Sequence, residues 1–195
     1  MNAKLNAVLQ AIDAANLADP VLEPDDAGVD HPEAYLYGLR MTSELEQLLG
    51  DQASDVLRIA ARGQHIERWL LKRATYPEGR AGYLQWRRDQ GSAHGARLAG
   101  LMQDAGYGAD ACARVGVLLR KEGIKRDPEV QQLEDIICFT FLKWYFAPFA
   151  AKHPEDKVLD IVAKTARKMS EEARARVLAE FDLPVPLADA VKAAA

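Results

Sequence analysis

The sequence predicts an all-α protein, and three observations lead to that prediction. Apolar residues recur at helical spacing along almost the whole chain, beginning with residues 5–14. No segment alternates clearly between apolar and polar residues within turn signals, which is the pattern of a half-buried strand. The composition, with 49% hydrophobic and 28% charged residues in a chain of 195, is ordinary for a globular protein. We therefore expect a single-domain bundle of about seven to nine helices.

Start and stop signals place the individual helices. The helices expected in the first half are residues 5–14 before Asp19-Pro20, 32–49 opened by Pro32, 54–71 capped by Ser54 or Asp55, and 81–106, broken near Gly91-Ser92. Residues 20–30, rich in proline and aspartate, are expected to form a loop.

The second half continues in the same way. The helices expected there are residues 111–121 capped by Asp110, 128–145 opened by Pro128, 155–168, and 171–181 capped by Ser170. Within the single domain 1–195, we expect an N-terminal helix and loop (1–30), a core (31–150) and C-terminal helices (151–195).

Composition also limits the compartment and the partners. Cys112 and Cys138 show no CxxC spacing, which indicates reduced thiols in a cytoplasmic protein. A formal net charge of −4 makes nucleic acid an improbable general partner. The longest apolar stretch, residues 136–149, is interrupted by Lys143 and Pro148 and is too short to span a membrane. We see no signal peptide at the amino terminus.

Positive charge is concentrated in residues 58–97. This stretch holds nine basic and three acidic residues, a local charge of +6 in a chain of net charge −4. A concentration of this kind indicates a site for a small anionic ligand, and the alternative is a solvated basic face. The cations that we single out as candidates for anion binding are Arg62, Arg68, Lys72, Arg80 and Arg87.

His65 lies at the boundary between an apolar face and a basic stripe of the predicted helix 54–71. A helical wheel places Val56, Ile59, Ile66 and Leu70 on one apolar face, and Arg58, Arg62, Trp69 and Lys72 beside His65 on a neighbouring stripe. An imidazole at this border could bind a ligand or a metal. The alternative is a histidine that only forms hydrogen bonds within the bundle.

Asp135 stands in a segment that is apolar on nearly every side, so we expect it to be buried. A buried carboxylate needs a cation, a metal or several donors to offset its desolvation. Metal or substrate chemistry and an internal salt bridge both satisfy this need. Glu122, near a helix end, is a further candidate, with a solvated surface acid as the alternative.

Three runs of sequence make a family recognisable. They are Leu57–Trp69 (LRIAARGQHIERW), Thr75–Arg87 (TYPEGRAGYLQWR) and Gln132–Asp135 (QLED). Together they resemble a family known only as domain of unknown function 4202, over about residues 6–181. This resemblance implies no activity.

A more distant resemblance does imply one. The order of Ile59-Ala60-Ala61 before His65, then Ser92-Ala93, Val117-Leu118-Leu119 and Leu133-Glu134-Asp135 is similar to that of HD-domain metal-dependent phosphohydrolases. The resemblance implies an HD-domain-like helical fold. In it, His65 matches the histidine of the His-Asp pair and Asp135 matches the late aspartate, whereas Ile66 replaces the paired aspartate.

The same resemblance implies a divalent metal, namely manganese, iron, zinc or magnesium. His65 and Asp135 would bind it, with further ligands from Glu44, His94 or Glu122, because no histidine stands on the preceding helix. The metal would activate a water and polarise a phosphoryl oxygen while the arginines neutralise the phosphate. His65, Asp135 and Glu122 are the catalytic candidates.

Three hypotheses about function follow. The first is a metal-dependent phosphohydrolase-like enzyme that acts on a small phosphorylated or nucleotide-like anion. The second is a non-catalytic helical domain that binds an anion or a nucleotide, which the isoleucine at position 66 favours. The third is a helical interaction module, in which helices 155–181 engage a partner or a second copy in a homodimer.

Overall fold

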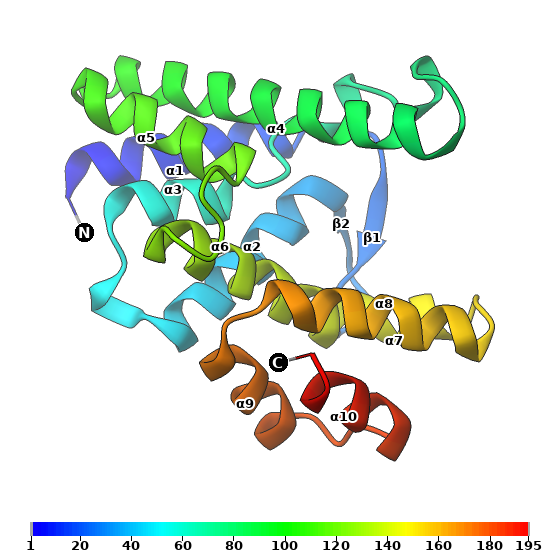
Figure 1. Ribbon diagram of the computed structural model, residues 1–195. Helices are drawn as coiled ribbons and strands as arrows, with labels where there is room; N and C mark the ends of the chain where they lie inside the picture. Colours follow the sequence, from blue (N-terminus) through cyan, green and yellow to red (C-terminus); the bar gives the residue numbers. More distant parts are fainter. Residues whose placement is uncertain (1, 195) are drawn as a thin grey trace. The chain divides into compact units, whose positions relative to one another are not determined.

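The computed structural model describes residues 2–194 and confirms the all-α class (Figure 1). The α-helices in that range are α1 (Ala3–Asn16), α2 (Glu33–Leu48), α3 (Asp55–Arg62), α4 (Gly79–Asp104), α5 (Ala109–Arg120), α6 (Pro128–Thr140), α7 (Phe146–Ala150), α8 (Glu155–Lys168), α9 (Glu171–Glu180) and α10 (Val185–Lys192). The total of ten exceeds the expected seven to nine, because α7 is separate from α6 and because α10 was not expected. None of these helices is long and apolar enough to cross a bilayer.

The chain divides into two compact units, which meet in the sequence between Glu122 and Gly123. The first unit holds α1 to α5, and the second holds α6 to α10. Each unit is described by itself below. The expected single domain with a core at 31–150 stays a prediction.

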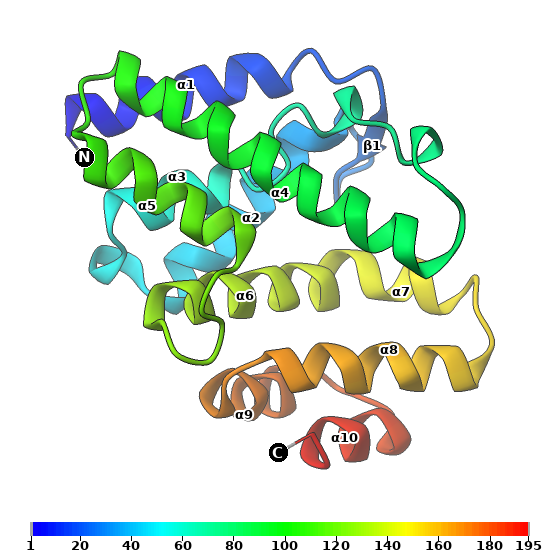
Figure 2. The same ribbon diagram turned by 45° about the horizontal axis from the view of Figure 1, so that its top comes forward.

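In the first unit, α4 and α5 run side by side (Figures 1 and 2). Glycines make this close approach possible: a Cβ on Gly95 would lie 3.0 Å from the Gly116 Cα, and one on Gly91 would lie 2.9 Å from the Leu119 carbonyl oxygen. The expected break of the helix near Gly91-Ser92 was wrong. Gly91 serves helix packing there and does not interrupt α4.

Residues 20–30 were expected to be loop, and this was wrong in part. Two three-residue strands, β1 (Leu22–Pro24) and β2 (Asp30–Pro32), pair antiparallel with Glu23 opposite His31. The Asp25 carboxylate accepts hydrogen bonds from the backbone N–H groups of Ala27 and Val29, which stabilises the turn between them. Strands of three residues are too short to show an alternating pattern, so the sequence did not reveal them.

The helix expected at 54–71 ends at Arg62, so its predicted wheel was wrong beyond that residue. Ser54 caps the helix as expected, because its hydroxyl oxygen accepts from the Leu57 N–H. The helix ends where Gly63 packs on α4, since a Cβ on Gly63 would lie 2.4 Å from Leu98 Cδ2. The segment after it contains short 3₁₀ turns at Arg68–Leu70 and Arg73–Thr75.

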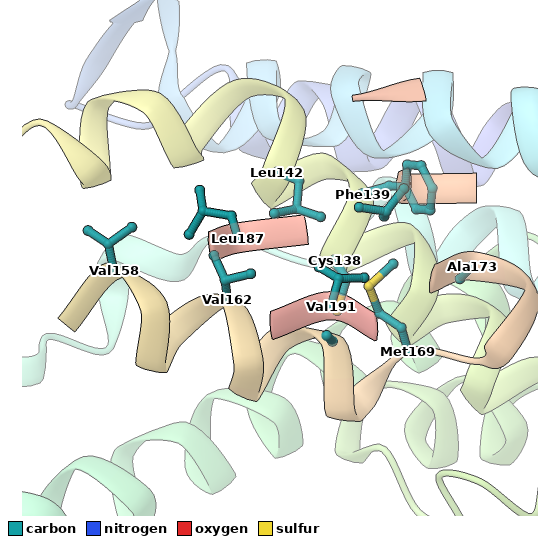
Figure 3. Close-up of a cluster of buried hydrophobic side chains, with 11 residues drawn as sticks. Cys138, Phe139, Leu142, Val158, Val162, Met169, Ala173, Leu187 and Val191 are labelled. Carbon is teal, nitrogen blue, oxygen red and sulfur yellow. The ribbon is translucent and has the colours of Figure 1, made fainter. Parts of the chain in front are cut away.

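In the second unit, α6 continues through a π-helical segment, Phe141–Tyr145, into α7. Helix α8 pairs with α6 and α7, and α10 pairs with α8 and α9 (Figure 2). Figure 3 shows the side chains that fill the space between these helices. They include Phe139 from α6, Leu142 from the π-helical segment, Val162 from α8 and Val191 from α10.

Candidate anion-binding site

The irregular segment 63–72, which we call the histidine loop, is held in place by side chains of other helices. Asn16 of α1 accepts a hydrogen bond from the Glu67 N–H at 3.0 Å. On the other side, the Gln90 amide and the Trp86 indole N–H of α4 donate to the Leu71 carbonyl oxygen at 3.2 and 2.8 Å. A loop without regular structure needs such partners for its backbone groups. The histidine loop is therefore well fixed.

The loop places His65 between two aromatic rings. Its imidazole stacks on the Tyr37 ring of α2, with centroids 3.7 Å apart and planes 14° apart. The His94 imidazole of α4 lies 6.5 Å away, centroid to centroid. Burial, helped by the charges of Arg68, His94 and Arg87, lowers the pKa of His65 well below its usual value. The His65 ring is therefore neutral at pH 7.

His94 is the most enclosed member of this group, with 4% of its surface exposed. Burial first and the Arg68 charge second lower the pKa of His94 to about 4, although its hydrogen bond to the Gln64 backbone raises that pKa. The two imidazoles thus bring no positive charge to the site at neutral pH. All of its charge comes from neighbouring basic side chains.

Arg68 is the central cation. Its guanidinium lies over the Trp86 ring, 4.8 Å from the centroid, and among residues 2–194 no carboxylate forms an ion pair with it. Burial, together with the charge of Arg87, lowers the pKa of Arg68, although Tyr37, Tyr83 and the Glu33 carboxylate, which forms no ion pair with it, act in the opposite direction. A half-buried cation without a carboxylate partner, next to a second cation, is a group that an anion would stabilise.

Arg87 is exposed and donates to the Tyr83 hydroxyl at 3.3 Å. Its charge acts on both His65 and Arg68, so it belongs to the same group. We call Tyr37, His65, Arg68, Arg87 and His94 the histidine–arginine cluster.

The structure does not bring the other predicted cations into this cluster. Arg62 forms a two-pronged ion pair with Asp13, with nitrogen–oxygen distances of 2.6 and 2.7 Å. Lys72 and Arg80 are exposed side chains on either side of the turn that precedes α4. Much of the positive charge in residues 58–97 is thus either compensated within the protein or solvated.

Asp135 is buried, as expected, with 5% of its surface exposed. Its Oδ1 accepts hydrogen bonds from the Ser170 N–H at 2.8 Å and from the Gln131 amide at 2.9 Å. Burial raises the pKa of Asp135 although these two donors and the Lys125 charge oppose the rise. Several donors, rather than an arginine salt bridge, therefore offset its desolvation. Within the second unit Asp135 connects α6 to the start of α9.

The remaining predicted ligands also have partners in the protein. Glu122 is paired with Arg120 at 2.6 Å, and the buried Glu44 accepts a hydrogen bond from Gln47 at 3.3 Å. Among residues 2–194, no three histidine, cysteine, aspartate or glutamate side chains are grouped as a metal would require. The residues described thus do not fit the implied metal centre, and we derive no step through a metal.

Sequence reasoning missed three side chains that act at the site. Tyr37 gave no signal beyond its place in an amphipathic helix, and Lys121, whose charge acts on His65, lies at the end of α5, far from His65 in sequence. Trp86 was not among the predicted site residues, although its ring lies against the Arg68 guanidinium. These three contacts depend on how α2, α4 and α5 are arranged around the histidine loop.

The chain matches the family described as Domain of unknown function (DUF4202) over residues 6–191. It belongs to that family. The family description carries no activity. Comparisons with curated proteins and with solved structures both give no match. The chemistry of the histidine–arginine cluster therefore has to be argued from this member's own residues.

Proposed function

We propose that this family member is a helical domain that binds a small phosphate-type anion, which is held by Arg68 and Arg87. One observation carries the proposal: Arg68 is a half-buried guanidinium that has no ion-pair partner among residues 2–194. Proteins seldom keep such a cation without a counter-charge. The Glu33 carboxylate acts on Arg68 without forming an ion pair, and an anion that contacts Arg68 would supply the direct partner.

The surroundings of Arg68 prepare it for this role. Its contact with the Trp86 ring orients the guanidinium without using any of its five N–H donors, and no group among residues 2–194 accepts a hydrogen bond from the Arg68 side chain. A planar guanidinium with free donors can form two parallel hydrogen bonds to a phosphate or carboxylate. Arg87, which is exposed, would contact the same ligand from the solvent side.

Calorimetric titration of the protein with inorganic phosphate tests this proposal. Arg68→Gln and Arg87→Gln should each weaken binding about tenfold or more, since each removes a charge-assisted hydrogen bond. Arg88→Gln is the control, because Arg88 is exposed, adjacent in sequence and identical in charge. It should change the affinity by less than about twofold.

Two outcomes would overturn the proposal. One is an unmodified protein that binds no phosphate at millimolar concentration. The other is an equal loss in all three variants, which would show a nonspecific response to net charge. Circular dichroism of each variant distinguishes lost binding from lost structure.

The metal-dependent phosphohydrolase and the interaction module stay predictions. Elemental analysis addresses the first: the resemblance predicts about one transition metal per chain, lost in both His65→Ala and Asp135→Asn. Titration with phosphate after treatment with a chelator separates the hypotheses. Anion binding by Arg68 and Arg87 should persist without metal, whereas metal-dependent binding should not.

A further inference from the structure

The exposed apolar side chains of the first unit gather at one end of it. Among residues 2–122, exposed large apolar side chains occur only within residues 17–29 and 70–84. These segments are neighbours, since the Glu67 N–H donates to the Asn16 side chain, and both figures show β1 at the same end as the segment between α3 and α4 (Figures 1 and 2). Exposed apolar surface that is gathered in this way is typical of an interface.

The β1–β2 hairpin supplies an acidic half of this surface. In its register, Leu22 lies opposite Pro32 and Pro24 lies opposite Asp30, so these four side chains share one face. The other face holds Glu23, which forms an ion pair with α2. Leu22 is 59% exposed, and Asp30 is exposed and forms no ion pair among residues 2–194. The outer face therefore combines apolar surface with an unpaired negative charge.

The two prolines also limit how a partner can contact the hairpin. Pro24 and Pro32 lack the backbone N–H that an added strand would need, so the edges of the hairpin are poor templates for a further strand. A partner is therefore expected to contact the side chains of the outer face.

The first turns of α4 supply a basic half. Arg80, Leu84 and Arg88 are spaced four residues apart in this helix, so their side chains lie along one stripe. All three are exposed, and neither arginine forms an ion pair among residues 2–194. An apolar side chain between two unpaired cations is the counterpart of Leu22 beside Asp30.

The charges of the two halves are opposite over a wider range of sequence. Residues 17–33 contain six acidic residues and no lysine or arginine, whereas residues 68–88 contain six basic residues and one acidic residue. A surface with one acidic and one basic half is complementary to itself. A half-turn that places the hairpin of one copy on α4 of another also forms the reciprocal contact.

We infer that this surface pairs with the same surface of a second copy of the chain, in a twofold dimer. Leu22 packs against Leu84 of the partner subunit, and Asp30 lies beside Arg80 of the partner subunit. The apolar contact supplies most of the affinity, and the charges set the orientation. This dimer does not depend on phosphate binding, because neither Arg68 nor Arg87 is needed for it.

Sedimentation velocity of the protein over a series of concentrations measures the association. We expect a monomer–dimer equilibrium that weakens as salt is added, because the paired charges are near solvent. Leu22→Ser should weaken the dimer about tenfold or more, since each dimer loses two apolar contacts. Val185→Ser is the control, because Val185 is an even more exposed apolar residue, at 72%, in the second unit. It should change the dissociation constant by less than about twofold.

A charge exchange tests the orientation. Asp30→Arg and Arg80→Asp each place like charges together in both reciprocal contacts, so each should weaken the dimer about tenfold. The double variant exchanges the two signs and should regain most of the lost affinity. Circular dichroism of each variant confirms that the helices are retained.

Three outcomes would overturn the inference. One is a protein that stays monomeric up to about 200 μM, and another is an equal effect of Leu22→Ser and Val185→Ser. The third is association that grows beyond the dimer with concentration, because a head-to-tail contact does not close. Should a variant not fold, sedimentation of the unmodified protein still decides between a monomer, a dimer and larger assemblies.

Discussion

The two units each bury a notable polar group, and these groups differ in whether the protein supplies their partners. In the first unit, Arg68 has no ion-pair partner among the described residues and His94 Nε2 has no hydrogen bond. In the second unit, the carboxylate of Asp135 is as deeply buried as His94, yet it accepts hydrogen bonds from Ser170 and Gln131. Burial therefore does not distinguish a candidate site from a structural contact in this protein. Between Asp135 and the histidine–arginine cluster, the presence or absence of a partner does.

This difference has a physical reason. A buried group whose partners all come from the protein contributes to stability and has nothing left to offer a ligand. A buried group without partners lowers stability, and a ligand recovers that free energy when it binds. Three changes test this contrast between Asp135 and the histidine–arginine cluster.

The largest expected effect is a loss of stability in acid caused by the first unit. The folded-state pKa of His94, about 4, lies below its unfolded value of 6.5. Between these values the unfolded chain binds more protons, so stability should fall as the pH drops from about 6.5 to 4. The loss at pH 4 should be on the order of 3 kcal/mol, and His65 acts in the same direction.

Urea unfolding measured at a series of pH values checks this expectation. His94→Asn should flatten the pH dependence in that window, whereas His153→Asn, in the second unit, is the matched control. The raised pKa of Asp135 has the opposite sign, because it adds stability at low pH that disappears as the pH rises through the folded-state value. A stability that does not change between pH 6.5 and 4 would contradict the burial of neutral imidazoles.

The second effect concerns Asp135, the buried acid that has hydrogen-bond partners within the protein. Asp135→Ala removes the acceptor for the Ser170 N–H and the Gln131 amide, so the free energy of unfolding should fall by about 2 kcal/mol. Asp135→Asn, which keeps an oxygen acceptor, should lose less. Asp160→Ala, at an exposed position of α8, should cost less than about 0.5 kcal/mol, because its ion pair with Lys164 is solvated.

Urea unfolding of the three variants gives these values, and phosphate titration accompanies it. We expect Asp135→Ala to leave phosphate affinity unchanged. A stable Asp135→Ala protein that no longer binds phosphate would reverse the assignment of Asp135 as a structural residue.

The smallest expected effect is a gain in stability. Arg68→Met removes a half-buried, unpaired charge and keeps an apolar stem against Trp86, so the ligand-free protein should become more stable by about 1 kcal/mol. Arg97→Met is the contrast, because Arg97 pairs with Glu67 at 2.9 Å on the surface and its loss should cost up to about 1 kcal/mol. Thermal unfolding without phosphate measures both changes. If Arg68→Met destabilises the protein as much as Arg97→Met does, Arg68 is not the unsatisfied cation described above.

Local sequence signals predicted much of the fold. The caps at Ser54 and Ser170 were confirmed, since each hydroxyl accepts from the backbone N–H three residues later. Pro128 opens α6 as expected. These features depend on residues close together in the chain, so spacing and residue type were sufficient.

Features that depend on distant residues were not predictable in this way. The periodicity of residues 54–71 suited a helix, but the chain leaves the helix at Gly63 because α4 packs there and because Asn16 and Trp86 satisfy the loop backbone. The stripe of cations predicted along that helix therefore does not form. Arg62 binds Asp13 of α1 instead of facing a ligand.

By itself the sequence determined the helical class, most helix starts, the concentration of charge in residues 58–97, and the position of Asp135 among apolar residues. The tertiary structure decided which of these polar groups have partners. Helix signals act over a few residues, whereas the partner of a buried charge can come from any part of the chain. For this reason Asp135 is satisfied by Ser170, whereas Arg68 lies against the ring of Trp86 and forms no ion pair among residues 2–194.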